Sequence, residues 1–166
     1  IQESTHKIET VIFISTDKAC KPVNVYGMSK AIAEQLYVEF AKQQSDIKVV
    51  LARYGNVLNS TGSIIPVFKK MIEDGVESLP ITDTKMTRFL LTLDQAINLV
   101  EWAYNHPTSH GKIAIPKIES LNIMDLVKAI AAACGKPDIN FHKIPIRDGE
   151  KLHEEMISEK IGRAHV

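Results

Sequence analysis

Two short apolar runs, each bounded by polar residues, dominate the first third of the chain. They cover residues 11–14 and 49–52, and runs of this length are typical of strands buried on both faces of a parallel sheet. Residues 29–43 lie between them and repeat apolar side chains at helical spacing. We predict a helix there, with Ile32, Leu36, Val38 and Phe40 on its buried stripe and Glu34, Gln35, Lys42 and Gln43 facing solvent.

The rest of the chain continues to alternate between strand-like and helix-like segments. Asp94 is the predicted N-cap of one helix, and Asn122 or Ser120 caps another. The alternation indicates an α/β protein. Further helices are predicted over residues 67–74, 94–105 and 123–134, and further short strands over residues 79–82, 111–116 and 140–144.

Polar residues gather where the two buried strands end. Ser15, Thr16, Asp17 and Lys18 follow the first strand, and the segment 53–57, Arg-Tyr-Gly-Asn-Val, follows the second. In an open α/β sheet, ligands bind in the crevice at the carboxyl ends of the strands. These side chains are therefore the candidate site.

Tyr26 and Lys30 open the helix that follows the first strand. They are four residues apart, so they share one helix face and lie one turn from each other. A nearby ammonium favours the ionised form of a phenol, and a phenolate can remove a hydroxyl proton. A surface tyrosine beside a solvated lysine is the alternative, and the spacing alone does not exclude it.

Composition narrows the class of protein without identifying a reaction. The 166 residues are 45% hydrophobic and 24% charged with zero formal net charge, as expected of a soluble globular protein with no nucleic-acid partner. Cys20 and Cys134 form no paired motif, which favours a reducing, cytoplasmic environment. No apolar run is long enough for a membrane span. His106 and His110 lack a third ligand, so we expect no metal site.

Several segments, taken in order, resemble a known family. The chain is similar to the extended short-chain dehydrogenase/reductases. Within that superfamily it is most similar to bacterial nucleotide-sugar 4,6-dehydratases that act on UDP-N-acetylglucosamine in surface polysaccharide and glycan biosynthesis. The resemblance covers residues 10–158 but only the latter part of the family's domain. It is carried by Ser-Thr-Asp-Lys at 15–18, Asn-Val-Tyr-Gly-Met-Ser-Lys at 24–30, Arg-Tyr-Gly-Asn-Val at 53–57, Gly-Ser-Ile-Ile-Pro at 62–66, Met-Thr-Arg-Phe at 86–89 and Gly-Glu-Lys-Leu-His-Glu at 149–154.

The resemblance implies a set of catalytic roles. Tyr26, aided by Lys30, would take the proton of the sugar 4-hydroxyl while hydride passes to a nicotinamide. Lys18 would remove the proton on carbon 5, Asp17 would protonate the leaving 6-hydroxyl, and Thr16 would hydrogen-bond the 4-oxygen. Return of hydride to carbon 6 gives a 4-keto-6-deoxy sugar, with inversion expected at carbon 5. Simple ion pairing of Asp17 with Lys18 is the alternative to these roles.

The resemblance also implies binding residues. Arg88 is a candidate for the diphosphate because a guanidinium matches phosphate geometry, although a structural pairing with an acid such as Asp83 is an equal alternative. A capping Asn56 and a surface Arg53 are the ordinary alternatives for that segment, and a solvated charged face is the alternative for residues 149–155. The predicted cofactor-binding residues are Ser15, Tyr26, Lys30, Tyr54 and Asn56, and the predicted substrate-binding residues are Arg53, Asn56, Arg88, Glu150 and Lys151.

The expected architecture is the C-terminal part of a Rossmann-like parallel sheet plus a small α/β substrate-binding region. Residues 1–59 are assigned to the dinucleotide-binding domain, 60–160 mainly to substrate binding, and 161–166 to a non-native tail. The scattered glycines form no phosphate-binding turn, so the main half of the NADP or NAD site is expected to be absent. We therefore expect a truncated, inactive fragment of a homo-oligomeric enzyme.

Three alternative functions stay open. A nucleotide-sugar 4-epimerase needs Tyr26 and Lys30 but has no use for Asp17 and Lys18 as an acid and base pair. A dehydratase that retains configuration at carbon 5 needs all four residues. A non-catalytic Rossmann-like binding module, finally, suits a chain without its phosphate turn.

Overall fold

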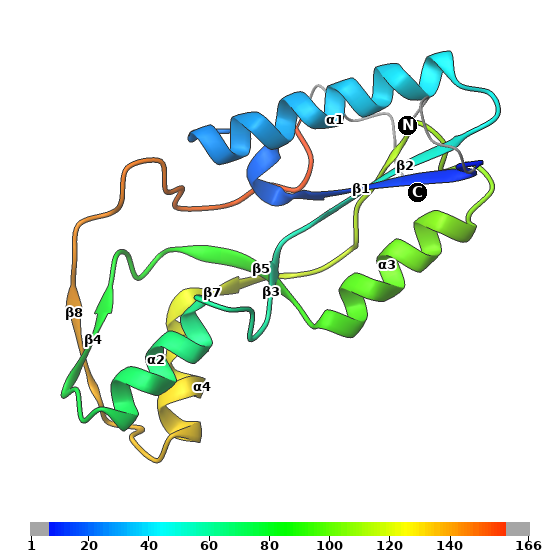
Figure 1. The fold of residues 1–166 in the computed structure, drawn as a ribbon. Helices are drawn as coiled ribbons and strands as arrows, with labels where there is room; N and C mark the ends of the chain where they lie inside the picture. Colours follow the sequence, from blue (N-terminus) through cyan, green and yellow to red (C-terminus); the bar gives the residue numbers. More distant parts are fainter. Residues whose placement is uncertain (1–6, 159–166) are drawn as a thin grey trace. The chain divides into compact units, whose positions relative to one another are not determined.

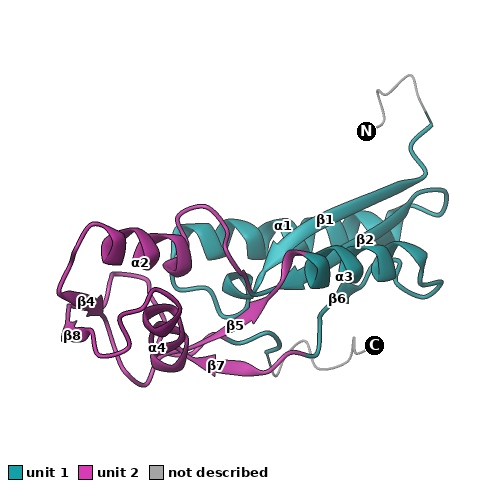
Figure 2. Ribbon diagram, turned by 90° about the horizontal axis from the view of Figure 1, so that it is seen from below, with its two compact units in different colours: residues 1–55, 94–117, 155–166 teal, residues 56–93, 118–154 magenta. Residues whose placement is uncertain are grey.

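The computed structural model describes residues 7–158, which form two compact units (Figure 1). Within the described residues, unit 1 consists of residues 7–55, 94–117 and 155–158, and unit 2 of residues 56–93 and 118–154 (Figure 2). None of the helices in this range is both long and apolar enough to cross a membrane. The suspected tail, residues 161–166, lies outside the described residues.

Unit 1 is a parallel three-stranded sheet with a helix on each face. The strands β1 (Thr10–Thr16), β2 (Lys48–Tyr54) and β6 (Ile113–Ala114) run in the order β1-β2-β6. Helix α1 (Val25–Gln43) covers one face and α3 (Leu93–Asn105) the other (Figure 1). The two strands predicted from apolar runs are thus confirmed, and Val49 to Ala52 in the central strand are fully buried.

Helix α1 presents a different face to the sheet from the one predicted. Its buried residues are Gly27, Glu34 and Ala41, whereas Ile32 and Leu36 are 63% and 65% exposed. The prediction that Glu34 faces solvent and that Ile32 and Leu36 are buried was therefore wrong. The apolar pattern gives the wrong buried face because it treats every charged residue as exposed. Glu34 is buried instead, since a buried arginine on β2 binds its carboxylate.

Unit 2 contains two small sheets and two helices. The strands β3 (Asn56–Val57), β5 (Thr87–Leu91) and β7 (Ser120–Asn122) form one sheet, with β3 parallel and β7 antiparallel to the central β5. Strands β4 (Ser78–Ile81) and β8 (Asn140–Lys143) form a parallel pair. Helices α2 (Ile64–Glu73) and α4 (Ile123–Ala133) complete the unit. Its core consists of Phe68, Ile72, Leu79, Ile81, Met86, Ile123, Leu126, Val127, Ile130 and Ala131.

Helix and strand limits follow local chemistry. Asn122 is the N-cap of α4, and its side chain accepts a 2.8 Å hydrogen bond from the Met124 amide. Helix α3 begins at Leu93, so Asp94 lies in its first turn rather than at the N-cap as predicted. Strands β3, β5 and β7 were not predicted, because two to five residues carry too little periodicity to read.

The chain alternates between the two units instead of dividing once. The first boundary falls between residues 55 and 56, close to the expected division at residue 60. Residues 94–117, however, return to unit 1, where α3 leads into β6 and β6 pairs with β2. Parallel pairing requires a crossover connection, which α3 supplies. These residues fall within the range 60–160 that the sequence assigns mainly to substrate binding.

Candidate active site

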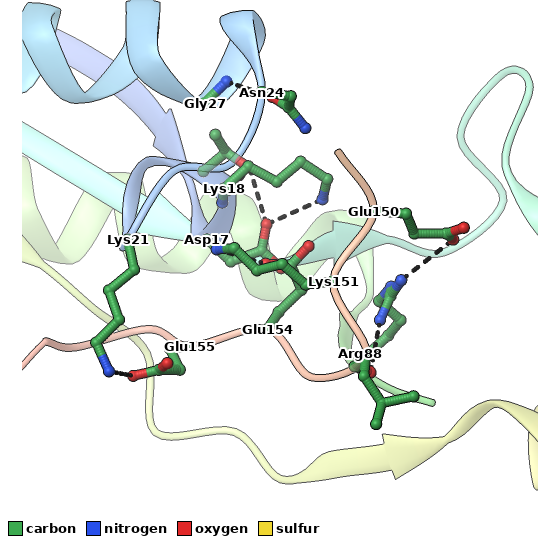
Figure 3. Close-up of polar contacts among 12 residues, drawn as sticks. Asp17, Lys18, Lys21, Asn24, Gly27, Arg88, Glu150, Lys151, Glu154 and Glu155 are labelled. Carbon is green, nitrogen blue, oxygen red and sulfur yellow. Dashed lines mark hydrogen bonds and ion pairs between the residues drawn. The ribbon is translucent and has the colours of Figure 1, made fainter. Parts of the chain in front are cut away.

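The loop after β1 places a carboxyl group in a buried position. Thr16 caps the short 3₁₀ helix Asp17–Ala19, and its hydroxyl donates to Asp17 Oδ1 over 2.9 Å. Lys18 Nζ lies 3.0 Å from the same oxygen (Figure 3). Asp17 is fully buried, and its other oxygen, Oδ2, has no hydrogen-bond partner among the described residues. A buried carboxyl oxygen without a partner is costly in a folded protein, so this loop is a candidate functional site.

The start of α1 packs closely against this loop. The Asn24 side chain accepts a 2.8 Å hydrogen bond from the Gly27 amide and so begins the helix (Figure 3). A Cβ atom on Gly27 would overlap the carbonyl oxygen of Lys18 and lie 3.1 Å from Cβ of Pro22. Glycine is therefore required for the helix to approach the loop this closely. Sequence analysis did not single out Gly27, although its place in the Tyr-Gly-x-Ser-Lys segment was visible.

Tyr26 and Lys30 lie at this helix start, as their spacing predicts. The Tyr26 side chain is 53% exposed. Lys30 Nζ donates to the carbonyl oxygen of Ile14 over 3.0 Å and lies 4.9 Å from the ring centroid of Phe13. These contacts attach the ammonium to β1, the strand that leads into the Asp17 loop.

Tyr54 belongs to the same region. It is the last residue of β2 and the register partner of Thr16 on β1. Burial raises the pKa of the Tyr54 phenol above its usual value, and the charge of ionised Tyr26 raises it further. Tyr54 is therefore a neutral hydroxyl near Tyr26 at neutral pH, and its predicted cofactor contact stays a prediction.

A buried ionic network lies behind these residues. Arg53 is fully buried and donates through Nε and Nη2 to both carboxylate oxygens of Glu34, and through Nη1 to the Met156 carbonyl oxygen over 2.7 Å. The Ser15 hydroxyl donates to Glu34 Oε1 over 2.6 Å. These contacts use the Arg53 guanidinium and the Ser15 hydroxyl, which we expected to bind substrate and cofactor. The predicted substrate contact of Arg53 and cofactor contact of Ser15 stay predictions that the described contacts do not support.

Unit 2 holds a cavity of about 530 Å³ that contains several of the predicted binding residues, a volume typical of small-molecule sites. Arg88 lines it and pairs with Glu150, with Arg88 Nη2 3.3 Å from Glu150 Oε1 (Figure 3). The alternative partner Asp83 instead accepts from the Lys85 amide in a turn. Polar residues on the cavity wall include Asn56, Ser63, Thr82, Arg88, Arg147 and Glu150.

Arg147 is a cavity residue that sequence analysis missed. Its amide donates weakly to Glu150 Oε2 over 3.4 Å, so one carboxylate contacts both arginine residues. The sequence offers one indication of this role, because Arg147 lies two residues before the Gly-Glu-Lys-Leu-His-Glu segment. Lys151 pairs with Glu154 over 3.2 Å, with only 13% of its side chain exposed. Its predicted contact with substrate stays a prediction.

The predicted site residues therefore form two groups. Thr16, Asp17, Lys18, Tyr26 and Lys30 lie at the loop after β1 and the start of α1 in unit 1, and Asn56, Arg88 and Glu150 line the cavity of unit 2. The first group offers a carboxyl group, a hydroxyl group, two ammonium groups and a phenol. The second offers two guanidinium groups on a partly apolar wall, a combination that suits an anionic ligand with a flat ring.

A family model described as polysaccharide biosynthesis protein matches residues 2–165. The chain belongs to this family. An inverting UDP-N-acetylglucosamine 4,6-dehydratase from Campylobacter jejuni subsp. jejuni serotype O:2 is 44% identical over 154 residues, which are 91% of this chain and 44% of that protein. The predicted membership of the short-chain dehydrogenase/reductase dehydratases is thus confirmed.

Similarity extends to epimerases and to solved structures. A UDP-glucose 4-epimerase from Rickettsia canadensis is 42% identical over 158 residues, 93% of this chain and 45% of the epimerase. The X-ray structure of Pen from Bacillus thuringiensis matches 92% of this chain and 48% of that chain, with 32% identity and a TM-score of 0.83. These similarities confirm the predicted Rossmann-like fold class. This chain spans less than half the length of these curated relatives.

Proposed function

We propose that the complete protein is an inverting UDP-N-acetylglucosamine 4,6-dehydratase of surface polysaccharide or glycan biosynthesis. The observation that carries the proposal is the Asp17 carboxyl, which is buried beside the Lys18 ammonium and keeps one oxygen without a partner among the described residues. An elimination of water needs both a base and an acid, and adjacent groups in a dry site can fill the two roles. The 44% identity to the Campylobacter dehydratase supports the substrate.

Tyr26 and Lys30 would act at the sugar 4-hydroxyl. Tyr26 is exposed at the start of α1 and can accept the hydroxyl proton, while Lys30, held by the Ile14 carbonyl, places a positive charge one helix turn away. Thr16 would hydrogen-bond the 4-oxygen. The resulting ketone acidifies the hydrogen on carbon 5, which makes the later elimination possible.

Lys18 and Asp17 would then carry out the elimination. Lys18 removes the proton from carbon 5 in its neutral form, and Asp17 in its protonated form donates to the leaving 6-hydroxyl. The 3.0 Å contact between Lys18 Nζ and Asp17 Oδ1 places the two groups side by side for these roles. The carbon–oxygen bond at carbon 6 breaks and water leaves, which gives a 4-keto-5,6-ene. Addition of hydride to carbon 6 and of a solvent-derived proton to carbon 5, on the face opposite to the one that lost its proton, would then complete the 4-keto-6-deoxy sugar.

The side chains around Tyr26 fit the nicotinamide end of NADP or NAD, but not its phosphates. Tyr26 and Lys30 at the mouth of a parallel sheet, with neutral Tyr54 beside them, form a donor set suited to a nicotinamide ribose and carboxamide. When bound, the nicotinamide supplies hydride acceptance from carbon 4 and donation to carbon 6. No glycine-rich phosphate turn follows a strand in this chain.

The cavity of unit 2 would hold the UDP group. Arg88 and Arg147 can hydrogen-bond the diphosphate through paired NH groups, which would require Glu150 to release or share Arg88. The apolar wall, which includes Ile64, Phe68 and Met71, suits the uracil ring. In this proposal the complete protein is a cytoplasmic homo-oligomer.

A 4-epimerase is the second candidate, because the Rickettsia canadensis relative carries that name at 42% identity. An epimerase uses the oxidation step but has no elimination, so it has no use for a buried Asp17 whose Oδ2 lacks a hydrogen-bond partner within residues 7–158. A non-catalytic module, the third candidate, gives no reason to bury that oxygen either. The Asp17–Lys18 pair therefore favours the dehydratase.

One experiment separates these candidates. The complete protein is incubated with UDP-N-acetylglucosamine and cofactor in D₂O, and the product is analysed by NMR. An inverting dehydratase gives a 4-keto-6-deoxy sugar with deuterium at carbon 5 and inverted configuration there, whereas an epimerase gives a 4-epimer without deuterium. Asp17→Asn and Lys18→Ala should each reduce product formation at least 100-fold, with Glu39→Gln on the exposed side of α1 as the control. Full turnover in both variants would refute the assigned roles.

A further inference from the structure

The Glu34–Arg53 pair takes no part in the proposed chemistry, although both residues are almost completely buried. Glu34 is 1% exposed and Arg53 is fully buried, and their contact is bidentate. Burying two charges costs solvation free energy, and apolar side chains of similar volume often stabilise a fold equally well. Stability alone is therefore a weak reason for this pair, and its contacts indicate what else it does.

The sheet register places Ser15 beside Arg53. The two residues are Cα partners in the parallel pairing of β1 with β2. Successive side chains of a strand point to opposite faces, and Phe13, two residues before Ser15, stacks on Tyr37 of α1 with ring centroids 4.7 Å apart. Ser15 and Arg53 thus both face α1, where a single carboxylate, that of Glu34, binds both.

Successive turns of α1 are attached to successive residues of β1. Lys30 binds the carbonyl oxygen of Ile14, and Glu34, one turn later, binds the hydroxyl of Ser15. Tyr26 lies one turn before Lys30 on the same helix face. Because a shift of α1 along β1 would break both attachments, Glu34 fixes the position of this face relative to the loop that starts at Thr16.

The network also reaches a distant part of the chain. Arg53 Nη1 donates to the carbonyl oxygen of Met156, and the neighbouring Glu155 lies 2.6 Å from Lys21 Nζ (Figure 3). Residues 155 and 156 are thereby attached to the end of β2 and to the segment after the Asp17 loop. Glu34 is the carboxylate that holds Arg53 in place for this contact.

We propose that Glu34 is a positioning residue that, through Ser15 and Arg53, sets Tyr26 and Lys30 against the Thr16–Lys18 loop. The proposal rests on the proposed function for its effect on turnover. It also makes a purely structural claim, namely that the loop loses its fixed place when the carboxylate is removed. That claim can be measured without substrate.

The test compares variants of the complete protein. Glu34→Leu combined with Arg53→Met replaces the ion pair by apolar side chains, so neither charge is left buried without its partner. We expect a thermal unfolding midpoint close to that of the original protein and faster amide hydrogen exchange across residues 15–20. We also expect kcat to fall 10- to 100-fold with KM for the UDP-sugar changed less than twofold, since a small misplacement of catalytic groups costs rate.

Controls separate positioning from folding. Glu39→Gln removes the exposed pair of Glu39 with Lys42 on the same helix and should leave exchange and kcat unchanged. If the double variant does not fold, Ser15→Ala, which removes a single hydrogen bond to Glu34, should still accelerate exchange in residues 15–20. The proposal would be overturned if amide exchange across residues 15–20 were as slow as in the original protein, either in a folded double variant or in Ser15→Ala. A complete protein without dehydratase activity would refute the proposed function alone, since the exchange comparison needs no turnover.

Discussion

Tyr54 makes the free energy of unfolding depend on pH. Its phenol is partly buried at the end of β2, and its pKa is raised by burial first and by the charge of Tyr26 second. The unfolded chain lacks both effects, so its Tyr54 ionises near the usual pKa of 10.0. Above that pH the unfolded state loses a proton that the folded state keeps, which favours unfolding.

We therefore predict a specific loss of stability at alkaline pH. The contribution of Tyr54 is fully present below pH 10 and is lost as the pH rises through the raised pKa of the folded state. Tyr54→Phe should reduce the slope of unfolding free energy against pH above about pH 10. Urea denaturation at a series of pH values measures both slopes, and equal slopes would contradict the prediction. Tyr104→Phe, a half-exposed tyrosine on α3, is the matched control.

At the level of elements, the contact between α1 and the Asp17 loop depends on a missing side chain. The Gly27 amide is used by the Asn24 cap, and its Cα faces the Lys18 carbonyl. The neighbour is backbone rather than the end of a flexible side chain, so it cannot move aside cheaply. Any larger residue at position 27 must displace either the helix or the loop.

Gly27→Ala should therefore destabilise the fold in spite of the higher helix propensity of alanine. We expect a loss of about 1–3 kcal/mol in unfolding free energy, the usual cost of overpacking, measured by chemical denaturation. In the complete protein, turnover should fall as well, because Lys18 is displaced. Met28→Ala changes a half-exposed neighbour in the same turn and should stay within about 0.5 kcal/mol. A stabilised Gly27→Ala variant would show that the loop yields easily.

Local pattern predicted the elements better than it predicted their faces. The apolar runs of β1 and β2 and the Tyr26–Lys30 helix face were readable because each signal lies within a few residues. The burial of Glu34 was not readable, since its partner Arg53 is 19 positions away and is brought near by strand register. The short strands β3, β5 and β7 likewise form only when distant segments pair. The Arg88–Glu150 contact spans 62 positions and was equally hidden.

For the whole molecule, the described residues contain the buried Asp17 beside Lys18 in one unit and a cavity with two arginines in the other, but no phosphate-binding turn. This chain alone should therefore bind nicotinamide cofactors weakly. We predict no detectable formation of 4-keto sugar by the 166-residue chain and no saturable binding of NAD or NADP up to millimolar concentration by calorimetry. The complete protein, assayed beside it, should show both. Turnover by the short chain would contradict the prediction.

The insertion of residues 56–93 between β2 and α3 has a consequence for folding. Strands β1 and β2 are connected by a single helix, whereas β6 can join β2 only after the chain has passed through residues 56–93, about half of unit 2. Closing so long a loop costs more entropy and delays pairing. Until β6 arrives, the apolar edge of β2 is open to strands of other molecules. Aggregation during synthesis or refolding should therefore begin at residues 48–54, and a slowly formed second unit would prolong that exposure.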